Sequence, residues 1–144
     1  MLFRSRSTWR RWPPGADHVP TGVGITAAVV LGAVFVVSSV TKLASPGVWY
    51  SQAAGLGVPR PVAAVVPYLE AVLAAWLVVQ WHRAVAALVA AVVLCAFTAL
   101  IVVRLAQGRR PVCACFGALS ARPIGAATVV RNTAFLALAV VALL

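Results

Sequence analysis

Two cysteines separated by a single residue are the clearest candidates for chemistry in this sequence. Cys113 and Cys115 stand in the segment CACFG, residues 113–117. A disulfide between them needs a bent backbone, because it must bring the two Cα atoms to roughly 4.4–6.8 Å. Strained and exposed disulfides have more oxidising potentials and are often the labile or catalytic ones. Arg109 and Arg110 lie just upstream and favour a thiolate. The pattern indicates either thiol–disulfide exchange or a passive bridge or pair of free thiols.

A metal site is not expected at these cysteines. Structural zinc takes four ligands from cysteine, histidine or carboxylate side chains, and only two thiols stand here. His18 and His82 fall on the other side of the membrane in the topology argued below, and Glu70 is the only acid nearby. Cys95 stands alone in an apolar stretch, where a thiol usually behaves as a small hydrophobe. We therefore expect neither a metal ion nor a cofactor.

Glu70 is the only acidic residue in the apolar part of the chain. A carboxylate inside a membrane is costly unless it is paired, hydrogen-bonded or neutral. Its candidate partners are Lys42 and Arg131, the latter followed directly by Asn132. Pro67, one turn before Glu70, frees a backbone carbonyl and kinks a helix. The group predicts either an ion pair that fixes the helix register or a proton relay that serves the thiols.

The composition explains which elements must position these residues. Of 144 residues, 63% are hydrophobic and 10% are charged, whereas soluble domains show roughly 45–50% and about 25%. The composition therefore indicates an integral membrane protein, with the lipid bilayer as its solvent. The net charge of +10 would suit a nucleic-acid binder. However, the basic residues lie in the N-terminal tail and at the ends of apolar runs, where they suit lipid headgroups and topology signals, so no nucleic acid is expected.

Four apolar segments have the length of about 20 residues that crosses a bilayer. The sequence predicts an all-α bundle of four transmembrane helices, at about residues 23–41, 61–81, 84–103 and 123–144. Residues 1–22 are expected to form a basic cytoplasmic tail, and residues 23–144 the transmembrane domain. The connection 42–60 is typical of a short amphipathic segment at the membrane interface. The connection 104–122 carries the cysteine pair.

An even number of crossings places both connections on one side and both termini on the other. Arginine and lysine residues are nearly balanced between the two sides, but the first helix usually dominates. We therefore expect a multi-pass protein of the cell membrane with both termini in the cytoplasm. The small residues Gly24, Ala27, Ala28 and Gly32 predict close helix packing, with the bias of a GC-rich genome as the alternative.

Taken in order, these motifs resemble the MauE family of methylamine-utilisation membrane proteins, which are relatives of the DoxX-like four-helix group. The resemblance rests on residues 35–43, on Pro-x-x-Glu at 67–70, on Cys-x-Cys-Phe-Gly at 113–117 and on Arg-Asn at 131–132. It covers roughly residues 22–144. The resemblance implies a DoxX-like four-helix fold and a role in thiol–disulfide handling at the outer membrane face.

The protein that gives the family its name is associated with the maturation of a disulfide-rich periplasmic dehydrogenase subunit, in which it acts together with a thioredoxin-like protein. Carried over to this chain, the resemblance implies an extracytoplasmic thioredoxin-like or substrate partner and activity like that of a thiol–disulfide oxidoreductase. The site would comprise six residues, with the thiols exchanging and the others tuning the field or moving protons: Cys113, Cys115, Glu70, Lys42, Arg131 and Asn132. The alternative is a non-enzymatic assembly factor or an accessory subunit of a membrane complex. A small transporter coupled to Glu70 is a weaker alternative, because no inverted repeat is visible.

Overall fold

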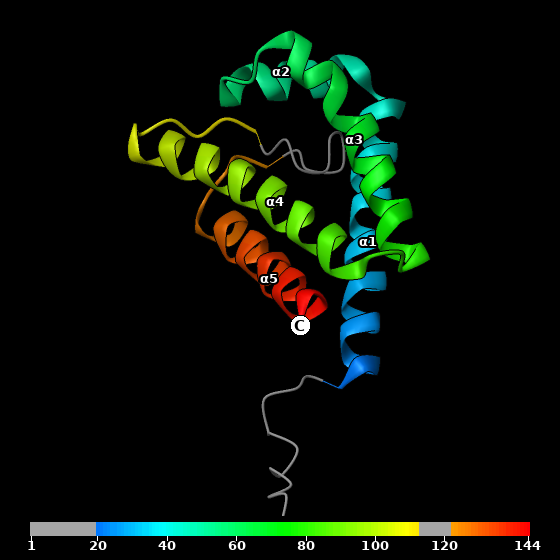
Figure 1. Cartoon of the computed structure of the whole chain (residues 1–144). Coiled ribbons are helices and arrows are strands. Elements are labelled where there is room, and N and C mark those ends of the chain that lie inside the picture. Colours follow the sequence, from blue (N-terminus) through cyan, green and yellow to red (C-terminus); the bar gives the residue numbers. More distant parts are fainter. Residues whose placement is uncertain (1–19, 113–121) are drawn as a thin grey trace, which may run out of the picture.

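The structure, a computed structural model, describes residues 20–112 and 122–144. The tail up to residue 19 and the segment 113–121, with its two cysteines, lie outside the described residues. The described chain forms five helices: α1 (Thr21–Ala44), α2 (Pro46–Leu56), α3 (Arg60–Val79), α4 (Arg83–Ala106) and α5 (Ala126–Leu143). Four of them, α1, α3, α4 and α5, are long and apolar enough to cross a membrane. The predicted all-α protein with four membrane-spanning helices is confirmed (Figure 1).

The spanning helices differ by a few residues from the segments expected by hydropathy. The second ends at Val79, two residues early, because Gln80 and His82 have positive φ angles of 64° and 48°. This left-handed backbone makes the sharp turn into α4. The last helix begins at Ala126, after Gly125, whose N–H is bonded to the hydroxyl of Thr128. Local turn geometry, which hydropathy does not report, sets these ends.

The connection after α1 contains the helix α2, which lies across one end of the bundle (Figure 1). It begins with a proline at its first position, where the missing N–H costs nothing. It ends at Gly57, whose φ of 82° suits glycine. The guanidinium of Arg104 from α4 packs where a Cβ of Gly57 would stand, and its Nε donates to the carbonyl of Leu56 at 3.2 Å. The end of α2 is therefore tied to the end of α4.

Small residues allow α1 to pack closely against its neighbours. A Cβ on Gly32 would lie 2.9 Å from Cγ2 of Val78 and 3.3 Å from the carbonyl of Ala74, both in α3. A Cβ on Gly24 would meet the guanidinium of Arg83 at 3.2–3.3 Å. Close backbone approach is the usual basis of helix association in lipid. The packing interpretation of these glycines therefore holds in the folded bundle.

Two apolar clusters fill the bundle, one on either side of a polar layer. The cluster nearer the start of α1 and the end of α5 joins α1, α3, α4 and α5: Ala27, Ala28, Leu31, Phe35, Leu73, Ala74, Leu77, Ala86, Ala87, Ala90, Leu94, Ala139 and Ala142. The cluster under α2 is smaller: Trp49, Ala53, Leu56, Ala63, Val66, Ile101 and Ile124. Polar side chains from all four spanning helices lie between these clusters.

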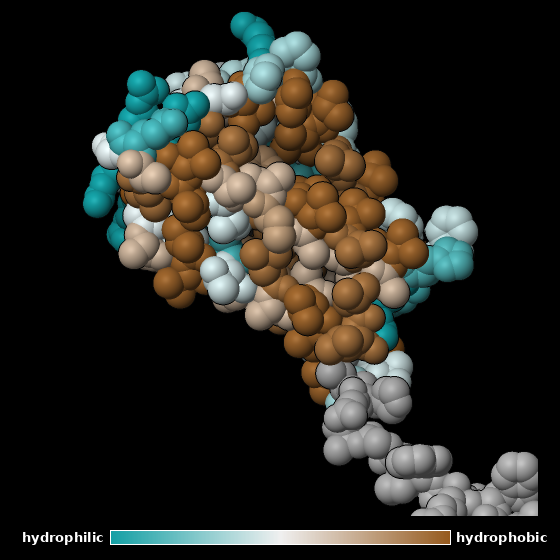
Figure 2. Space-filling model, turned by 60° about the vertical axis from the view of Figure 1, so that its left-hand side comes forward, coloured by the Kyte–Doolittle hydropathy of each residue, from teal (hydrophilic) through white to brown (hydrophobic). Residues whose placement is uncertain are grey.

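The outer surface of the bundle is apolar around its middle. Many large side chains with more than 40% exposure belong to the spanning helices, among them Val36, Val65, Val72, Val92 and Val130. Figure 2 shows this surface as mainly hydrophobic, with hydrophilic residues at the upper end, which carries α2, and at the right-hand edge of the view. Large exposed apolar surfaces are typical of sites of contact with a membrane or another protein, and here they lie on the helices that are long enough to span a bilayer. The protein is therefore a multi-pass membrane protein.

Candidate functional site

A layer of polar side chains crosses the bundle between the two apolar clusters. Each spanning helix contributes to it: α1 with Ser38 and Lys42, α3 with Glu70, α4 with Thr98 and α5 with Asn132. Only Thr98 of these is not fully buried. Polar groups inside a membrane are costly and usually serve a function, so this layer is the candidate site. It contains three of the six residues that sequence reasoning singled out, namely Lys42, Glu70 and Asn132.

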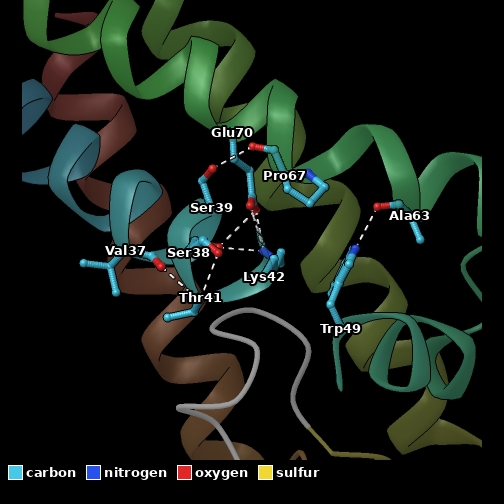
Figure 3. Close-up of polar contacts among 9 residues, drawn as sticks. All are labelled: Val37, Ser38, Ser39, Thr41, Lys42, Trp49, Ala63, Pro67 and Glu70. Atoms are coloured by element: carbon cyan, nitrogen blue, oxygen red, sulfur yellow. Dashed lines mark hydrogen bonds and ion pairs between the residues drawn. The ribbon is translucent and has the colours of Figure 1, made fainter. Parts of the chain in front are cut away.

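The centre of the polar layer is an ion pair between α1 and α3. Nζ of Lys42 lies 2.7 Å from Oε1 and 2.8 Å from Oε2 of Glu70. The same ammonium donates to Oγ of Ser38 at 2.6 Å, and this hydroxyl donates to Oε1 of Glu70 at 3.1 Å. Figure 3 shows the three side chains converging. Of the two cations predicted as partners of Glu70, Lys42 forms the ion pair.

Lys42 lies in the last turn of α1, yet its amino group points into the bundle. Side chains of a helix lean toward its N-terminus, so the ammonium reaches back over Ser38, four residues earlier. Aromatic rings from two other helices cover it. Nζ lies 4.9 Å from the centroid of the Trp49 ring (α2) and 5.6 Å from the centroid of the Phe97 ring (α4). Cation–π contacts of this kind are strongest when the cation is desolvated. The charge is thus enclosed by a carboxylate, a hydroxyl and two rings.

Pro67 explains why α2 is held in this position. A proline has no N–H, so the carbonyl four residues earlier, that of Ala63, loses its helical partner. Nε1 of Trp49 donates to this carbonyl at 2.7 Å (Figure 3). The hydroxyl of Ser39 donates to the carbonyl of Pro67 itself at 2.8 Å. The interruption of α3 therefore creates the docking point for the tryptophan that covers Lys42.

On the far side of Glu70, the polar layer continues to α4 and α5. Nδ2 of Asn132 donates to Oγ1 of Thr98 at 3.4 Å, and that hydroxyl donates to the carbonyl of Leu94 at 2.7 Å. Glu70, Ser38 and Asn132 line one side of a cavity of about 30 Å³, with apolar side chains on the other. A water needs roughly 10–15 Å³ of such space and two or more polar partners. The cavity is large enough for a water, but the surface that faces it is almost entirely apolar, which is typical of an empty cavity.

Arg131 precedes Asn132 on α5 and is half-buried. Its neighbour Asn132 is 1% exposed and faces the polar layer. The two predicted residues are thus placed differently, because adjacent positions on a helix point about 100° apart. Asn132 lines the cavity beside Glu70, whereas the ion pair of Glu70 is made by Lys42.

Cys113 and Cys115 lie outside the described residues, but both flanks of their segment are described. Val112 and Pro123 form an isolated antiparallel bridge, and the N–H of Ile124 donates to the carbonyl of Pro111 at 2.8 Å. Ile124 is 1% exposed and belongs to the cluster under α2. We call this pairing of residues 111–112 with 123–124 the neck. It fixes both ends of the cysteine segment at the end of the bundle that carries α2.

Sequence reasoning missed three groups that complete the layer: Ser38, Trp49 and Thr98. Ser38 could have been found as the residue four before Lys42, on the same helical face. Trp49 carries a donor that could satisfy the carbonyl freed by Pro67, but only the folded chain shows that they meet. Within residues 20–112 and 122–144, no group of three or more histidine, cysteine or acidic side chains is placed to hold a metal ion.

Comparison with known proteins gives one match. The family model described as methylamine utilisation protein MauE matches residues 21–144. This range contains the five described helices, the polar layer and the cysteine segment between the two sides of the neck. No curated protein and no solved structure matches the chain significantly.

Proposed function

Since the chain belongs to the MauE family of methylamine utilisation proteins, we propose that it exchanges disulfides with an extracytoplasmic partner through Cys113 and Cys115. The membrane-embedded bundle holds the cysteine segment at one surface of the bilayer. The partner is a thioredoxin-like protein or a protein whose disulfides are being matured. The protein lies in the cell membrane, with both termini in the cytoplasm and the neck on the outer side.

The position of the neck is the observation that carries this proposal. Ile124, on one side of the neck, packs in the same cluster as Trp49. Trp49 in turn covers the ammonium of Lys42. The ends of the cysteine segment and the buried ion pair are thus linked through one packed cluster at one end of the bundle. A protein that exchanges disulfides at the membrane surface and moves the accompanying protons through a buried carboxylate needs the cysteine segment and the ion pair at the same end of the bundle.

The exchange proceeds by two substitutions at sulfur. A thiolate of the partner attacks one sulfur of the Cys113–Cys115 disulfide, forming a mixed disulfide as the original S–S bond breaks. The departing cysteine leaves as a thiolate and takes up a proton. The partner's second thiol then loses its proton and attacks the mixed disulfide, which releases the reduced pair and the oxidised partner. The partner's first thiol also loses a proton when it becomes the attacking thiolate, and the second cysteine of the pair takes up a proton on its release. Two electrons and two protons therefore pass from the partner to the pair, and the reverse sequence returns them.

The polar layer serves the protons of this exchange. Glu70 is held by Lys42 and Ser38 on one side and lines the small cavity with Asn132 on the other. Arg131 contributes positive charge at the same level of α5, next to Asn132. In this proposal the four predicted residues outside the cysteine segment set the local field and move protons, and the cysteines carry the electrons.

Trapping of a mixed disulfide tests the proposal. Trapping uses the reverse sequence: in cells, the one cysteine that remains attacks a disulfide of the partner, and without the second cysteine of the pair the mixed disulfide is not resolved and accumulates. We expect Cys113→Ser or Cys115→Ser to yield a larger, reducible species on non-reducing gels, absent from the double variant. Cys95→Ser is the matched control, since this cysteine stands in α4, well away from the neck.

If neither single variant traps a partner and the redox state of the pair never changes, the proposal is wrong. A partner that co-purifies equally well with the double cysteine variant would instead support the accessory-subunit alternative.

A further inference from the structure

A groove of about 600 Å³ lies between α2 and the neck. Pro111 and Val112 of the neck line one wall of the groove. The other wall is lined by residues of α2 that follow one another at about one helical turn: Gly47, Val48, Ser51, Gln52 and Gly55. The groove is narrow at one end, where a Cβ on Gly55 would lie 3.1 Å from Cβ of Pro111. At the other end, a Cβ on Gly47 would meet no atom of residues 20–112 or 122–144 within 4 Å.

The groove ends beside the residue that precedes Cys113 in the chain. Val112 lines it directly and is exposed. Any protein that exchanges disulfides with the pair must bring a sulfur into line with it, and such alignment needs further contacts next to the reacting atoms. An apolar groove of this size next to the cysteine segment offers those contacts.

Positive charge surrounds this end of the molecule. The guanidinium of Arg60 lies 5.0 Å from the ring of Tyr50 in α2, and Arg104 is bonded to the carboxyl end of α2. Arg109 and Arg110 are exposed and directly precede Pro111. The whole chain has only two acidic residues, and Glu70 is buried in its ion pair. Among the described residues, no exposed carboxylate balances these arginines.

We propose that the groove binds an extended segment of the partner protein in which apolar residues are flanked by acidic ones. The apolar side chains enter the groove between α2 and the neck, and the carboxylates meet the surrounding arginines. This inference rests on the proposed function and adds to it the chemistry by which the partner is recognised. Complementary charge of this kind mainly sets specificity and the association rate. Anionic lipids are the alternative occupant, because their headgroups would meet the arginines and their acyl chains would fill the groove. The position of Val112, next to the cysteine segment, favours a protein that reacts with the cysteines, and the experiment below distinguishes the two.

Gly47→Leu is the variant that blocks the groove without disturbing the fold. The new side chain enters open space, and leucine has a higher helix propensity than glycine. Gly22→Leu is the matched control. Gly22 is also the second residue of its helix and is also open, but it lies in α1 at the opposite end of the bundle.

Binding is measured on the Cys113→Ser/Cys115→Ser protein in nanodiscs of zwitterionic lipid, so that docking is separated from exchange. The probe is a fluorescent peptide of about ten residues that alternates glutamate with valine, and the control peptide has lysine for glutamate. We expect the acidic peptide to bind about tenfold more tightly than the basic one, and less tightly as salt is raised. Gly47→Leu should weaken binding by about tenfold, and Gly22→Leu should leave it unchanged.

Equal binding of the two peptides, or no effect of Gly47→Leu, would overturn the groove proposal. The proposal would also be wrong if the acidic peptide did not bind the protein in zwitterionic nanodiscs. Anionic lipid would then be the better candidate for the ligand of the arginines. Failure of the proposed function gives a different result: the peptide would still bind in the groove, but a cysteine-containing version would form no mixed disulfide with the wild-type pair. If Gly47→Leu leaves disulfide exchange unaffected, the proposed function stands but the groove is not the binding site of the partner.

Discussion

The ammonium of Lys42 lies within 2.8 Å of both carboxylate oxygens of Glu70, and the two side chains are 0% and 4% exposed. One residue stands in the last turn of α1 and the other near the middle of α3. The pair therefore joins two spanning helices at the level where the packing changes from one apolar cluster to the other. Its enclosure by Ser38, Trp49 and Phe97 leaves neither charge exposed to lipid.

Removing one member of this pair should be more harmful than removing both. Lys42→Met or Glu70→Leu leaves a buried charge without its counterion, which typically costs about 3–5 kcal/mol. The double variant replaces the pair by apolar side chains of similar size and should recover most of that loss. Thermal unfolding of the purified protein in detergent, followed by circular dichroism, measures the order. A double variant as unstable as the sum of the two single ones would show that the charges do not stabilise one another.

The hydrogen bond from Trp49 to Ala63 should matter only because of Pro67. Trp49→Phe removes the donor and leaves a buried carbonyl unsatisfied, at a cost of about 1–3 kcal/mol. Pro67→Ala restores a backbone N–H that can bond to the same carbonyl. The cost of Trp49→Phe should therefore be smaller in the Pro67→Ala background. A double-mutant cycle on unfolding free energies measures this coupling, and strictly additive effects would contradict it.

The contact of Gly32 with α3 should not tolerate a larger side chain. Because a Cβ there would lie 2.9 Å from Val78, Gly32→Val should push α1 and α3 apart and cost about 1–3 kcal/mol. Gly22→Val, where the new side chain meets open space, is the control. The thermal midpoint of each variant gives the comparison. Equal midpoints would mean that the two helices are not in close contact at this position in the membrane.

The cysteines should differ in their reaction with a membrane-impermeant maleimide on intact cells. Cys113 and Cys115 should be labelled from outside, and more strongly after prior reduction if they form a disulfide. Cys95 should stay unlabelled, because it is exposed halfway along the apolar helix α4, on surface that contacts lipid. Single-cysteine variants read by mass shift give each thiol separately. Labelling of the pair only after the cells are permeabilised would place the neck in the cytoplasm.

Hydropathy alone was sufficient to predict the spanning helices and the burial of Glu70. It could not choose between Lys42 and Arg131 as the partner of Glu70, because the order of helices around a bundle leaves no mark on hydropathy. The role of Pro67 was half visible: a freed carbonyl could be predicted, but its donor, Trp49, lies 14 residues from Ala63 on a helix that was expected only as an interfacial segment. Asn132 was singled out, whereas Thr98, its hydrogen-bond partner on α4, resembles any other small residue of an apolar run.

The Lys42–Glu70 pair also constrains how the nascent chain can enter the membrane. A charge at the centre of a lone apolar helix costs roughly 2.5–3.5 kcal/mol to insert. Glu70, near the middle of α3, carries this cost until it meets Lys42, whereas Lys42, in the last turn of α1, can reach the membrane interface until α3 arrives. The helix α2 is synthesised between them, and its Trp49 can bond to Ala63 only once α3 has arrived. The first three helices should therefore settle in the bilayer as one cotranslational unit, with α4 and α5 adding to a bundle whose charges are already matched.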